Sequence, residues 1–349
     1  MKLVRIVFFG TPEFAVPTLE ALVTAGYEIV AVVTQPDKPV GRGLKMEAPP
    51  VKIRAEELGL KVLQPLTLKV AAGLQPAHHT KRRLKPATTI VDELRALSAE
   101  VAVVVAYGKI IPKEILGIFP KGVLNIHPSL LPKYRGPSPI QTAILNGDAE
   151  TGVTVMLLDE EMDHGAIIQQ SPPLRLRGGW SLPSRREGWE GLRQPTGGTL
   201  AQLLAKEGAK LLVDVLPKWL AGEIEPQPQD HNGATFTKML ERSDGRIDWN
   251  TPAEQIERMV RAYDLWPGTF TVWNEKRVKI FRASLLHATI GCANNATPGY
   301  VWKTEDGHLA VNCNPGAIVL EEIQLEGKKP MVGADFLRGY PKFFGSTLM

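Results

Sequence analysis

The sequence predicts an α/β protein in two parts: a Rossmann-like, doubly wound, mostly parallel sheet over residues 1–222, then a small OB-like β-barrel over residues 236–349. Three observations predict this order. Nearly continuous apolar runs alternate with helical patterns in the first part, as in parallel sheets that helices cover on both faces. A polar stretch with prolines, residues 223–235, has the composition of a linker. Beyond it, short strands separated by turn residues are typical of a small barrel.

The first βα unit begins almost at the N-terminus. An apolar run over residues 3–9 predicts a buried strand, a Gly-Thr-Pro turn interrupts it, and residues 14–22 follow as a helix. A second strand at 28–34 is expected parallel and next to the first, because crossovers of this kind are right-handed. The turn after the first strand lacks the Gly-x-Gly-x-x-Gly spacing, which argues against a nicotinamide or flavin site.

A basic loop follows the second strand. Residues 35–48 hold Lys38, Arg42 and Lys45 among glycines and prolines, which disfavour helix and strand. Cations in such a loop can adapt to an irregular phosphate backbone. An ordinary solvated loop is the alternative.

The other elements of the first part follow from the same patterns. In chain order, we expect a helix at 51–58, a short strand at 61–63, a helix at 91–97, a central strand at 101–108, a strand from 122, a helix at 140–146, a strand at 151–158, its antiparallel partner at 165–170 and a long helix at 199–220. Two stretches without such a period, about 70–90 and 173–197, are predicted to be surface insertions. Their basic residues leave a contact with RNA open.

The second part is expected to open with a helix at 253–262, capped by a side chain from residues 248–251. The strands of the barrel are predicted at 277–281, 299–302, 308–311 and 317–320. The cations of this part gather early, and we expect them to form a strip that binds phosphate together with the basic loop: Lys238, Arg242, Arg246, Arg258, Arg261, Lys276, Arg277 and Lys279.

Composition restricts the class of protein. A chain of 349 residues with 44% hydrophobic and 22% charged residues is typical of a soluble two-domain protein. No apolar run is long enough to span a membrane and no targeting segment precedes the first strand, so a cytoplasmic protein without membrane association is expected. Cys292 and Cys313 are too few for a disulfide framework and are expected to pack as apolar residues. The formal net charge of +4 permits a polyanionic partner but does not require one.

Polar side chains stand where the strand from residue 122 ends. Asn125 and His127 are two residues apart and therefore point to one face, at the strand end where open α/β sheets bind ligands. The strand at 151–158 leads into an acidic turn, residues 159–165, from which a carboxylate could reach His127. An Asn-x-His pair alone could also be no more than a strand end beside a solvated loop.

Longer motifs carry a resemblance to a known family. Residues 125–141 (NIHPSLLPKYRGPSPIQ) and 149–165 (AETGVTVMLLDEEMDHG) resemble the 10-formyltetrahydrofolate-dependent formyltransferases. Residues 8–22 (FFGTPEFAVPTLEAL) and 35–43 (QPDKPVGRG) are similar to the members of this family that act on methionyl-tRNA. The resemblance covers nearly the whole chain except the two predicted insertions.

The resemblance implies an activity, namely transfer of the formyl group of 10-formyltetrahydrofolate to the α-amino group of methionyl initiator tRNA. The product, N-formylmethionyl-tRNA, serves translation initiation. Asn125 and His127 would donate hydrogen bonds to the formyl oxygen during direct attack by the amine. Asp163, the second carboxylate of an Asp-x-x-x-Asp-x-Gly pattern, would orient His127 and assist proton movement. His164 stands where relatives carry a small or hydroxyl residue.

The resemblance also implies binding residues. Folate would contact the segment Ser129, Leu130, Leu131 and Pro132, with a cis peptide bond before Pro132, and the end of the central strand at Tyr107. The tRNA would contact the three cations of the basic loop, Lys38, Arg42 and Lys45. No metal is expected, and the protein is expected to be a monomer.

Two alternatives stay open. One is a related enzyme that formylates the amine of a sugar nucleotide or of glycinamide ribonucleotide. A glycinamide enzyme would need an anion-cradling turn after the first strand, where this chain offers Glu13. The other is a non-catalytic RNA-binding relative, which the intact set of Asn125, His127 and Asp163 disfavours. A formylation assay separates an enzyme from a silent relative.

Overall fold

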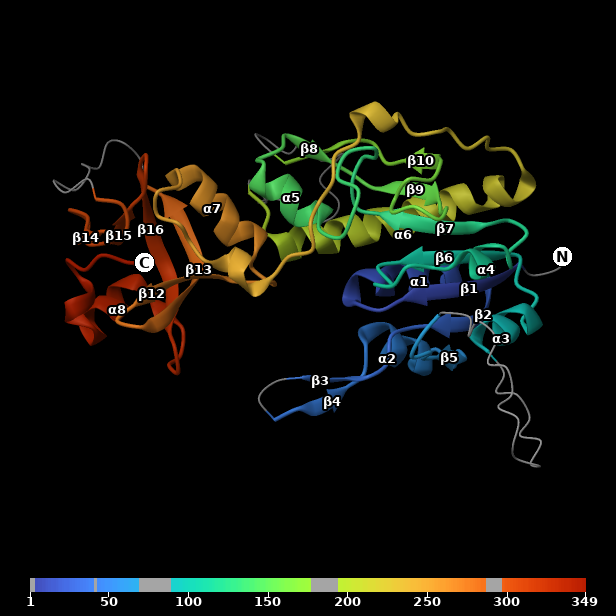
Figure 1. The fold of residues 1–349 in the computed structure, drawn as a ribbon, viewed down its shortest axis with the longest axis horizontal. Coiled ribbons are helices and arrows are strands. Elements are labelled where there is room, and N and C mark those ends of the chain that lie inside the picture. Colours follow the sequence, from blue (N-terminus) through green and yellow to red (C-terminus); the bar gives the residue numbers. More distant parts are fainter. Residues whose placement is uncertain (1–3, 41–42, 69–88, 177–193, 287–296) are drawn as a thin grey trace, which may run out of the picture. The chain divides into compact units, whose positions relative to one another are not determined.

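The structure is a computed structural model that describes residues 4–40, 43–68, 89–176, 194–286 and 297–349 (Figure 1). Arg42, Cys292 and most of both predicted insertions lie outside the described residues. Two compact units interleave along the chain: the first unit holds Met1–Gly136, Gly152–Leu174 and Ala201–Phe236, and the second holds Pro137–Thr151, Arg175–Leu200 and Thr237–Met349. The domain boundaries predicted at residues 222 and 236 therefore stay predictions.

The first unit is built from the expected alternation of strands and helices. Its elements are β1 (Arg5–Gly10), a 3-10 turn at Glu13–Ala15, α1 (Val16–Thr24), β2 (Glu28–Val33), β3 (Lys38–Val40), β4 (Lys45–Glu47), α2 (Pro50–Glu57), β5 (Val62–Leu63), α3 (Ile90–Ala96), β6 (Val101–Val105), α4 (Lys113–Leu116), β7 (Val123–His127), β9 (Thr154–Leu157), β10 (Ile167–Gln170) and most of α6 (Gly197–Ala221).

The main sheet has the strand order β10-β9-β7-β6-β1-β2-β5. The five strands from β7 to β5 are parallel, and β6 lies at the centre of the sheet, as predicted. β9 is antiparallel to both of its neighbours, β7 and β10. The prediction of a mostly parallel sheet with an antiparallel edge is confirmed.

Apolar residues on both sides of each central strand explain why these runs do not alternate. Every residue from Ile6 to Phe9 and from Val101 to Val105 is buried. On one face, Val7, Phe9 and Val104 pack with residues of α3 and α4. α6 lies beside β7 (Figure 1). The two elements are so close that a Cβ added at Gly208 would come within 2.7 Å of the side chain of Ile126.

The basic segment after β2 is not the irregular loop that its prolines and glycines predicted. Lys38–Val40 pairs with Lys45–Glu47 as an antiparallel hairpin that projects from the first unit (Figure 1). Pro39 is compatible with a strand here because a two-stranded ribbon has free edges, where the missing N–H of proline needs no partner. Leu44, with φ +50°, bends the chain at the turn.

The second unit contains a small antiparallel sheet. Its elements are α5 (Pro139–Leu145), β8 (Glu150–Thr151), β11 (Leu174–Arg175), 3-10 turns at Arg242–Gly245 and Pro341–Phe343, α7 (Ala253–Ala262), β12 (Thr269–Trp273), β13 (Lys276–Leu285), β14 (Val301–Lys303), β15 (Leu309–Asn312), β16 (Ala317–Leu325), β17 (Met331–Val332) and α8 (Gly333–Gly339). A 3-10 turn at His231–Gly233 belongs to the first unit.

The strand order of this sheet is β12-β13-β16-β15-β14, with β17 added to β16. All four predicted strands are present, and β12 and β17 were missed. Inward side chains of β13 and β16, among them Ile280 and Ile323, form a core with α7, Phe336 and Phe343. The sheet is a curled half-barrel, which confirms the OB-like prediction at the level of fold class.

Helix α7 spans the predicted residues, but its predicted cap is wrong. The residue before the helix is Pro252, which offers no side-chain acceptor. The N–H of Ala253 instead donates to the carbonyl of Pro315, 3.0 Å away. A loop from a distant part of the unit therefore satisfies the helix end, which local sequence could not reveal. No helix among the described residues has the length and apolarity needed to cross a membrane.

Cys313 is buried and should react slowly with alkylating agents. The side chain packs in the core of the second unit with 6% exposure, and burial raises the pKa of its thiol to about 12. At pH 8 roughly one thiol in ten thousand is then ionised, and only the thiolate reacts with alkylating agents.

We expect iodoacetamide at pH 8 to modify Cys313 of the native protein at least 100-fold more slowly than it modifies glutathione. Peptide mass spectrometry measures the rate and separates Cys313 from Cys292. The same residue should react readily in urea. Alkylation of the native protein at the rate of glutathione would contradict the burial described here.

Candidate active site

Two predicted catalytic side chains lie at the carboxyl end of β7. Asn125 and His127 alternate onto the same face as Val123, which belongs to the core beside α3 and α4. Asn125 is 9% exposed and His127 is 4% exposed. Among the described residues the amide of Asn125 has no hydrogen-bond partner, so its N–H groups are available to a ligand.

The hydrogen bond of His127 to Tyr134 determines which ring nitrogen can bind a substrate. Its Nε2 lies 2.9 Å from the carbonyl oxygen of Tyr134. A carbonyl only accepts, so Nε2 carries a hydrogen and donates it. The Nδ1 atom is therefore the nitrogen left for other partners, and it faces the carboxylate of Asp163.

Asp163 lies beside His127, as the sequence predicted. Its Oδ2 is 3.6 Å from Nδ1 of His127, slightly longer than a hydrogen bond, and accepts a hydrogen bond of 2.7 Å from the N–H of Gly136. Two of the other three carboxylates of the turn have other partners: Asp159 binds Nδ1 of His164, and Glu160 pairs with Lys113. The structure thus brings one carboxylate to the face that carries Asn125 and His127.

The route by which Asp163 reaches His127 was not foreseen. Because β9 runs antiparallel to β7, its last residue, Leu157, lies opposite Leu124, three residues before His127. Three residues of strand span about 10 Å. The turn after β9 must therefore fold back along the sheet. It does so with Asp163 at φ +50° and with Gly165 where a Cβ would lie 1.9 Å from the carbonyl oxygen of Leu157.

The segment predicted to bind folate is held by a hydrogen bond within its own loop and by hydrogen bonds from β9 and β10. Ser129 is 1% exposed, and its hydroxyl donates to the carbonyl of Lys133. The hydroxyl of Thr154 in β9 donates to the carbonyl of Ser129 and accepts from the N–H of Leu131. The carbonyl of Leu131 accepts from Gln170 in β10. The Leu131–Pro132 peptide bond is cis, as predicted.

Tyr107, which was predicted to contact folate, follows the end of β6. Its side chain is 1% exposed and meets the ring of Phe9 edge-on in the core, 5.5 Å between centroids. Burial raises the pKa of Tyr107 to about 12. Its carbonyl accepts from Thr11 and Gln35. Since the side chain fills the core, folate contact at this position stays a prediction only for the backbone.

The cations predicted to bind tRNA differ in their exposure to solvent. Lys38 and Lys45 are exposed on the β3–β4 hairpin, and Nζ of Lys38 donates to Gln35. Arg42 lies between them, outside the described residues. In the second unit, Lys276 and Lys279 are exposed on β13.

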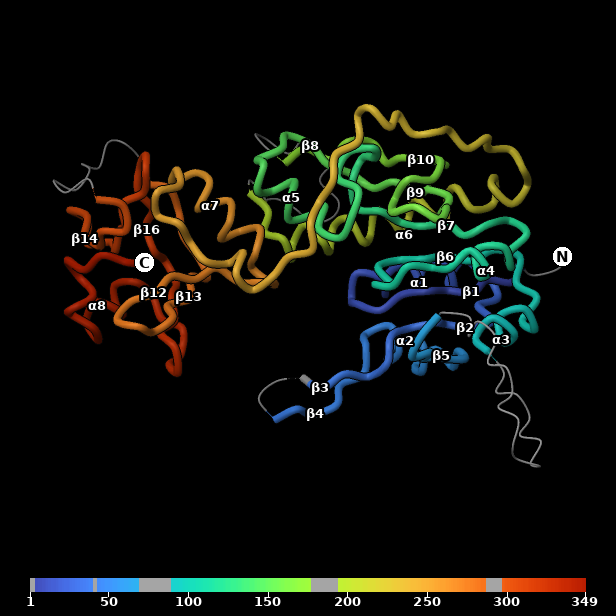
Figure 2. The backbone as a smooth tube through the Cα atoms, viewed as in Figure 1, coloured from blue at the N-terminus to red at the C-terminus, as the bar shows by residue number. Residues whose placement is uncertain are grey.

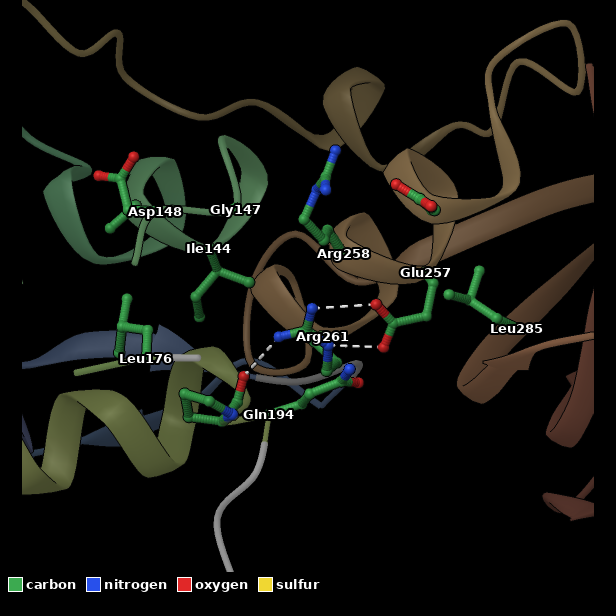
Figure 3. Close-up of a pocket in the computed structure, with 12 residues that line it drawn as sticks. Ile144, Gly147, Asp148, Leu176, Gln194, Glu257, Arg258, Arg261 and Leu285 are labelled. Atoms are coloured by element: carbon green, nitrogen blue, oxygen red, sulfur yellow. Dashed lines mark hydrogen bonds and ion pairs between the residues drawn. The ribbon is translucent and has the colours of Figure 1, made fainter. Parts of the chain in front are cut away.

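Arg261 does not belong to an exposed strip. Its guanidinium is bound by both carboxylate oxygens of Glu257, at 2.6 and 2.9 Å, and by the carbonyl of Pro195. These groups border a cavity of about 350 Å³ between α5 and α7 (Figure 3). No predicted catalytic or folate-binding residue lines that cavity. In the described part of the chain, no group of three or more His, Cys, Asp or Glu side chains is arranged to hold a metal ion.

Three residues next to the site were missed by the sequence reasoning. Gln229 and Arg135 are both 4% exposed and hydrogen-bond to each other, and His231 accepts from Arg135. Gln229 and His231 lie in the stretch predicted to be a linker, whose polar composition hides a buried glutamine. The only available signal was the Tyr-Arg-Gly string inside the longer motif, which carried no assigned role.

Family models match both parts of the chain. Residues 4–174 match the formyl transferase model, and residues 239–341 match the model of the formyl transferase C-terminal domain. Similar proteins named methionyl-tRNA formyltransferase occur in Chloroflexus aurantiacus, with 46% identity over 96% of each chain, and in a Roseiflexus species, with 47% identity over 96% of this chain and 92% of the other. A protein of that name from Desulforamulus reducens is 41% identical over 99% of this chain and 97% of its own.

Solved structures of low identity share the fold. HypX from Aquifex aeolicus in complex with tetrahydrofolic acid matches 98% of this chain and 48% of its own, with 17% identity and a TM-score of 0.59. An N-formyltransferase from Helicobacter canadensis, in complex with folinic acid and dTDP-3-aminofucose, matches 91% of this chain and 99% of its own, with 18% identity and a TM-score of 0.60.

The position of Gly165 should not accept a side chain. Gly165→Ala would force a Cβ against the backbone of Leu157, which cannot move without disturbing β9. Overpacking of this kind costs about 1–3 kcal/mol. We therefore expect a lower urea midpoint for unfolding.

Gly117→Ala is the matched control. Gly117 is exposed, has an ordinary helical φ and would place a Cβ 3.6 Å from the nearest backbone oxygen. Its midpoint should be unchanged or slightly raised. Equal midpoints for Gly165→Ala and the parent protein would show that the turn after β9 does not need its folded-back path.

Proposed function

Because the chain belongs to the formyl transferase family, we propose that it transfers the formyl group of 10-formyltetrahydrofolate to the α-amino group of methionyl initiator tRNA. Relatives that are 41–47% identical, over almost the whole length of both chains, carry the name methionyl-tRNA formyltransferase. The product would be N-formylmethionyl-tRNA for translation initiation. We further propose that the enzyme acts in the cytoplasm as a monomer.

One observation carries the catalytic part of the proposal. A buried amide without a partner and an imidazole next to a carboxylate share one face at the end of β7. These groups are two hydrogen-bond donors and one proton acceptor. Formyl transfer needs donors for the formyl oxygen and an acceptor for the proton that the amine loses. The donor set therefore fits the chemistry of the reaction.

Bound 10-formyltetrahydrofolate would supply the formyl carbon. The amine nitrogen bonds to that carbon, the bond from the carbon to N10 of the folate breaks, and negative charge develops on the formyl oxygen between these events. Asn125 Nδ2–H and a protonated Nδ1 of His127 would stabilise that charge. In a site with little water, one such donor lowers the activation free energy by about 3–4 kcal/mol.

Asp163 has a separate task in this proposal. Its carboxylate keeps the ring of His127 in place from the Nδ1 side, while the carbonyl of Tyr134 holds Nε2. The attacking amine must lose a proton and N10 must gain one. A carboxylate 15% exposed can relay that proton directly or through a water molecule. No covalent intermediate between enzyme and formyl group is needed.

Binding of the tRNA is assigned to the hairpin and to cations of the second unit. A tRNA offers regularly spaced phosphates, and Lys38, Lys45, Lys276 and Lys279 are exposed cations that can meet them. Formylation of free methionine should be very poor, because it lacks the contacts that position the amine. A sugar-nucleotide or glycinamide ribonucleotide substrate is not favoured, since the similar proteins of high identity are named for methionyl-tRNA.

Loss of either donor should lower turnover. We expect Asn125→Ala and His127→Ala each to reduce kcat by roughly two to three powers of ten, with tRNA affinity nearly unchanged. Transfer of a labelled formyl group to methionyl-tRNA, followed on acid-urea gels, measures this. His308→Ala removes an exposed histidine of the second unit and should leave kcat unchanged. Wild-type kcat in either site variant would remove that residue from the mechanism.

The hairpin should contribute to the salt dependence of tRNA binding. If Lys38 and Lys45 each meet one phosphate, charge reversal at both should reduce the slope of log affinity against log salt by about 1.8 in total. Lys61→Glu is the control, because Lys61 is also exposed but precedes β5, outside the hairpin. Equal slopes for the double variant and the parent protein would exclude the hairpin as a phosphate contact.

A further inference from the structure

The segment that follows α6 is anchored on the active site. Gln227 exchanges two backbone hydrogen bonds of 2.7 Å with Ile167 at the start of β10, and the carbonyl of Thr235 accepts from the N–H of Arg135 at 2.8 Å (Figure 2). The segment therefore joins the strand after the acidic turn to the loop after β7. Asp163 lies in the turn just before that strand, and the loop after β7 carries Tyr134, whose carbonyl holds His127.

Gln229 lies between these anchors and uses every hydrogen-bonding group of its side chain. Its Nε2 donates to the carbonyl of Asp163 at 2.9 Å and to the carbonyl of Gly165 at 2.7 Å. Its Oε1 accepts from Nε and Nη2 of Arg135 at 3.1 and 2.8 Å. A guanidinium only donates and a carbonyl only accepts, so the orientation of the amide is defined.

The two carbonyls held by Gln229 belong to the part of the turn that folds back over the sheet. Strand geometry alone would leave that turn beside Leu124, about 10 Å from His127. Asp163 also has φ +50°, a region that residues with a side chain seldom occupy unless neighbouring groups hold them there. Gln229 supplies such a restraint directly at the backbone of Asp163.

Arg135 connects this restraint to two histidines. Its Nη2 donates to Nδ1 of His231 at 2.8 Å, so that nitrogen carries no hydrogen. The ring of His231 stacks on His164, with centroids 4.2 Å apart and planes inclined by 3°. Nδ1 of His164 lies 2.6 Å from Oδ2 of Asp159. His164 thus has a partner in the segment after α6.

We propose that Gln229 and Arg135 are positioning residues that hold Asp163 in its reactive conformation, and that the stacked pair of His164 and His231 supports them from outside. This rests on the proposed function, since it assigns a task to residues around its carboxylate. None of these four residues needs to touch the substrates. Their effect on the reaction passes through the position of the Asp163 carboxylate relative to Nδ1 of His127 and the N–H of Gly136.

The test is a double-mutant cycle on kcat. Gln229→Met keeps the volume of the side chain but removes its hydrogen bonds, and Gln229→Glu keeps the acceptor for Arg135 but loses the donors to both carbonyls. We expect each to lower kcat 10- to 100-fold while KM for tRNA and folate changes less than threefold. In an Asp163→Asn background the same substitutions should lower kcat less than threefold, because the carboxylate that Gln229 positions is absent.

Gln227→Met is the matched control, because Gln227 is exposed in the same segment and pairs through its backbone. It should leave kcat unchanged. An equal loss in the Asp163→Asn background, or a loss confined to KM, would overturn the proposal, because a general structural role gives that pattern.

His164→Ser removes the ring that stacks on His231 and provides a second cycle if the Gln229 variants do not fold. We expect a two- to fivefold lower kcat with Asp163 present and no change in the Asp163→Asn background. Unchanged kcat in the presence of Asp163 would overturn the role of the stacked pair. If the parent protein formylates methionyl-tRNA but the substitutions lower kcat equally with and without Asp163, the positioning role is wrong and the proposed function stands. If the parent protein does not, the proposed function fails.

Discussion

The antiparallel pairing of β7 with β9 is the constraint on which the rest of the site depends. It gives the two strands one register, in which His127 lies opposite Thr154 and Leu157 lies opposite Leu124. Thr154 can then hold both ends of the loop Ser129–Leu131 with its hydroxyl. The same register sends the acidic turn away from His127, so the turn must return over the sheet. Gly165, the left-handed conformation of Asp163 and the restraint from Gln229 are the local features that accompany this return.

Several polar side chains of the site are buried, so their hydrogen bonds strongly affect the free energy. Asn125, His127, Ser129, Arg135 and Gln229 are all less than 10% exposed, and polar groups cost free energy in such places unless they are paired. Four of these five are paired with carbonyls or with each other. The amide of Asn125 is the exception among the described residues. A donor kept without a protein partner is ready to meet charge that develops on a substrate, which is how preorganised sites lower barriers.

Much of the fold could be predicted because its determinants are local in sequence. Buried apolar runs identified β1 and β6, and helical spacing identified α6. What could not be predicted depends on distant partners. Pro315 satisfies the start of α7, a free ribbon edge tolerates Pro39 in β3, and Phe9 receives the ring of Tyr107. The role of Gln229 could not be predicted for the same reason. It lies in a polar stretch with the composition of a linker, and its partners, the carbonyls of Asp163 and Gly165, are distant in sequence.

The proposed mechanism requires the formyl group to bind at Asn125 and His127. A crystal structure with 10-formyl-5,8-dideazafolate, a stable analogue of the folate co-substrate, would show where that group binds. We expect the formyl oxygen at about 3 Å from Nδ2 of Asn125 and on the Nδ1 side of His127, as expected for donors aimed at a developing charge. The pterin-like ring should lie against the loop Ser129–Pro132. A formyl group bound beyond hydrogen-bonding distance of both Asn125 and His127 would contradict this mechanism.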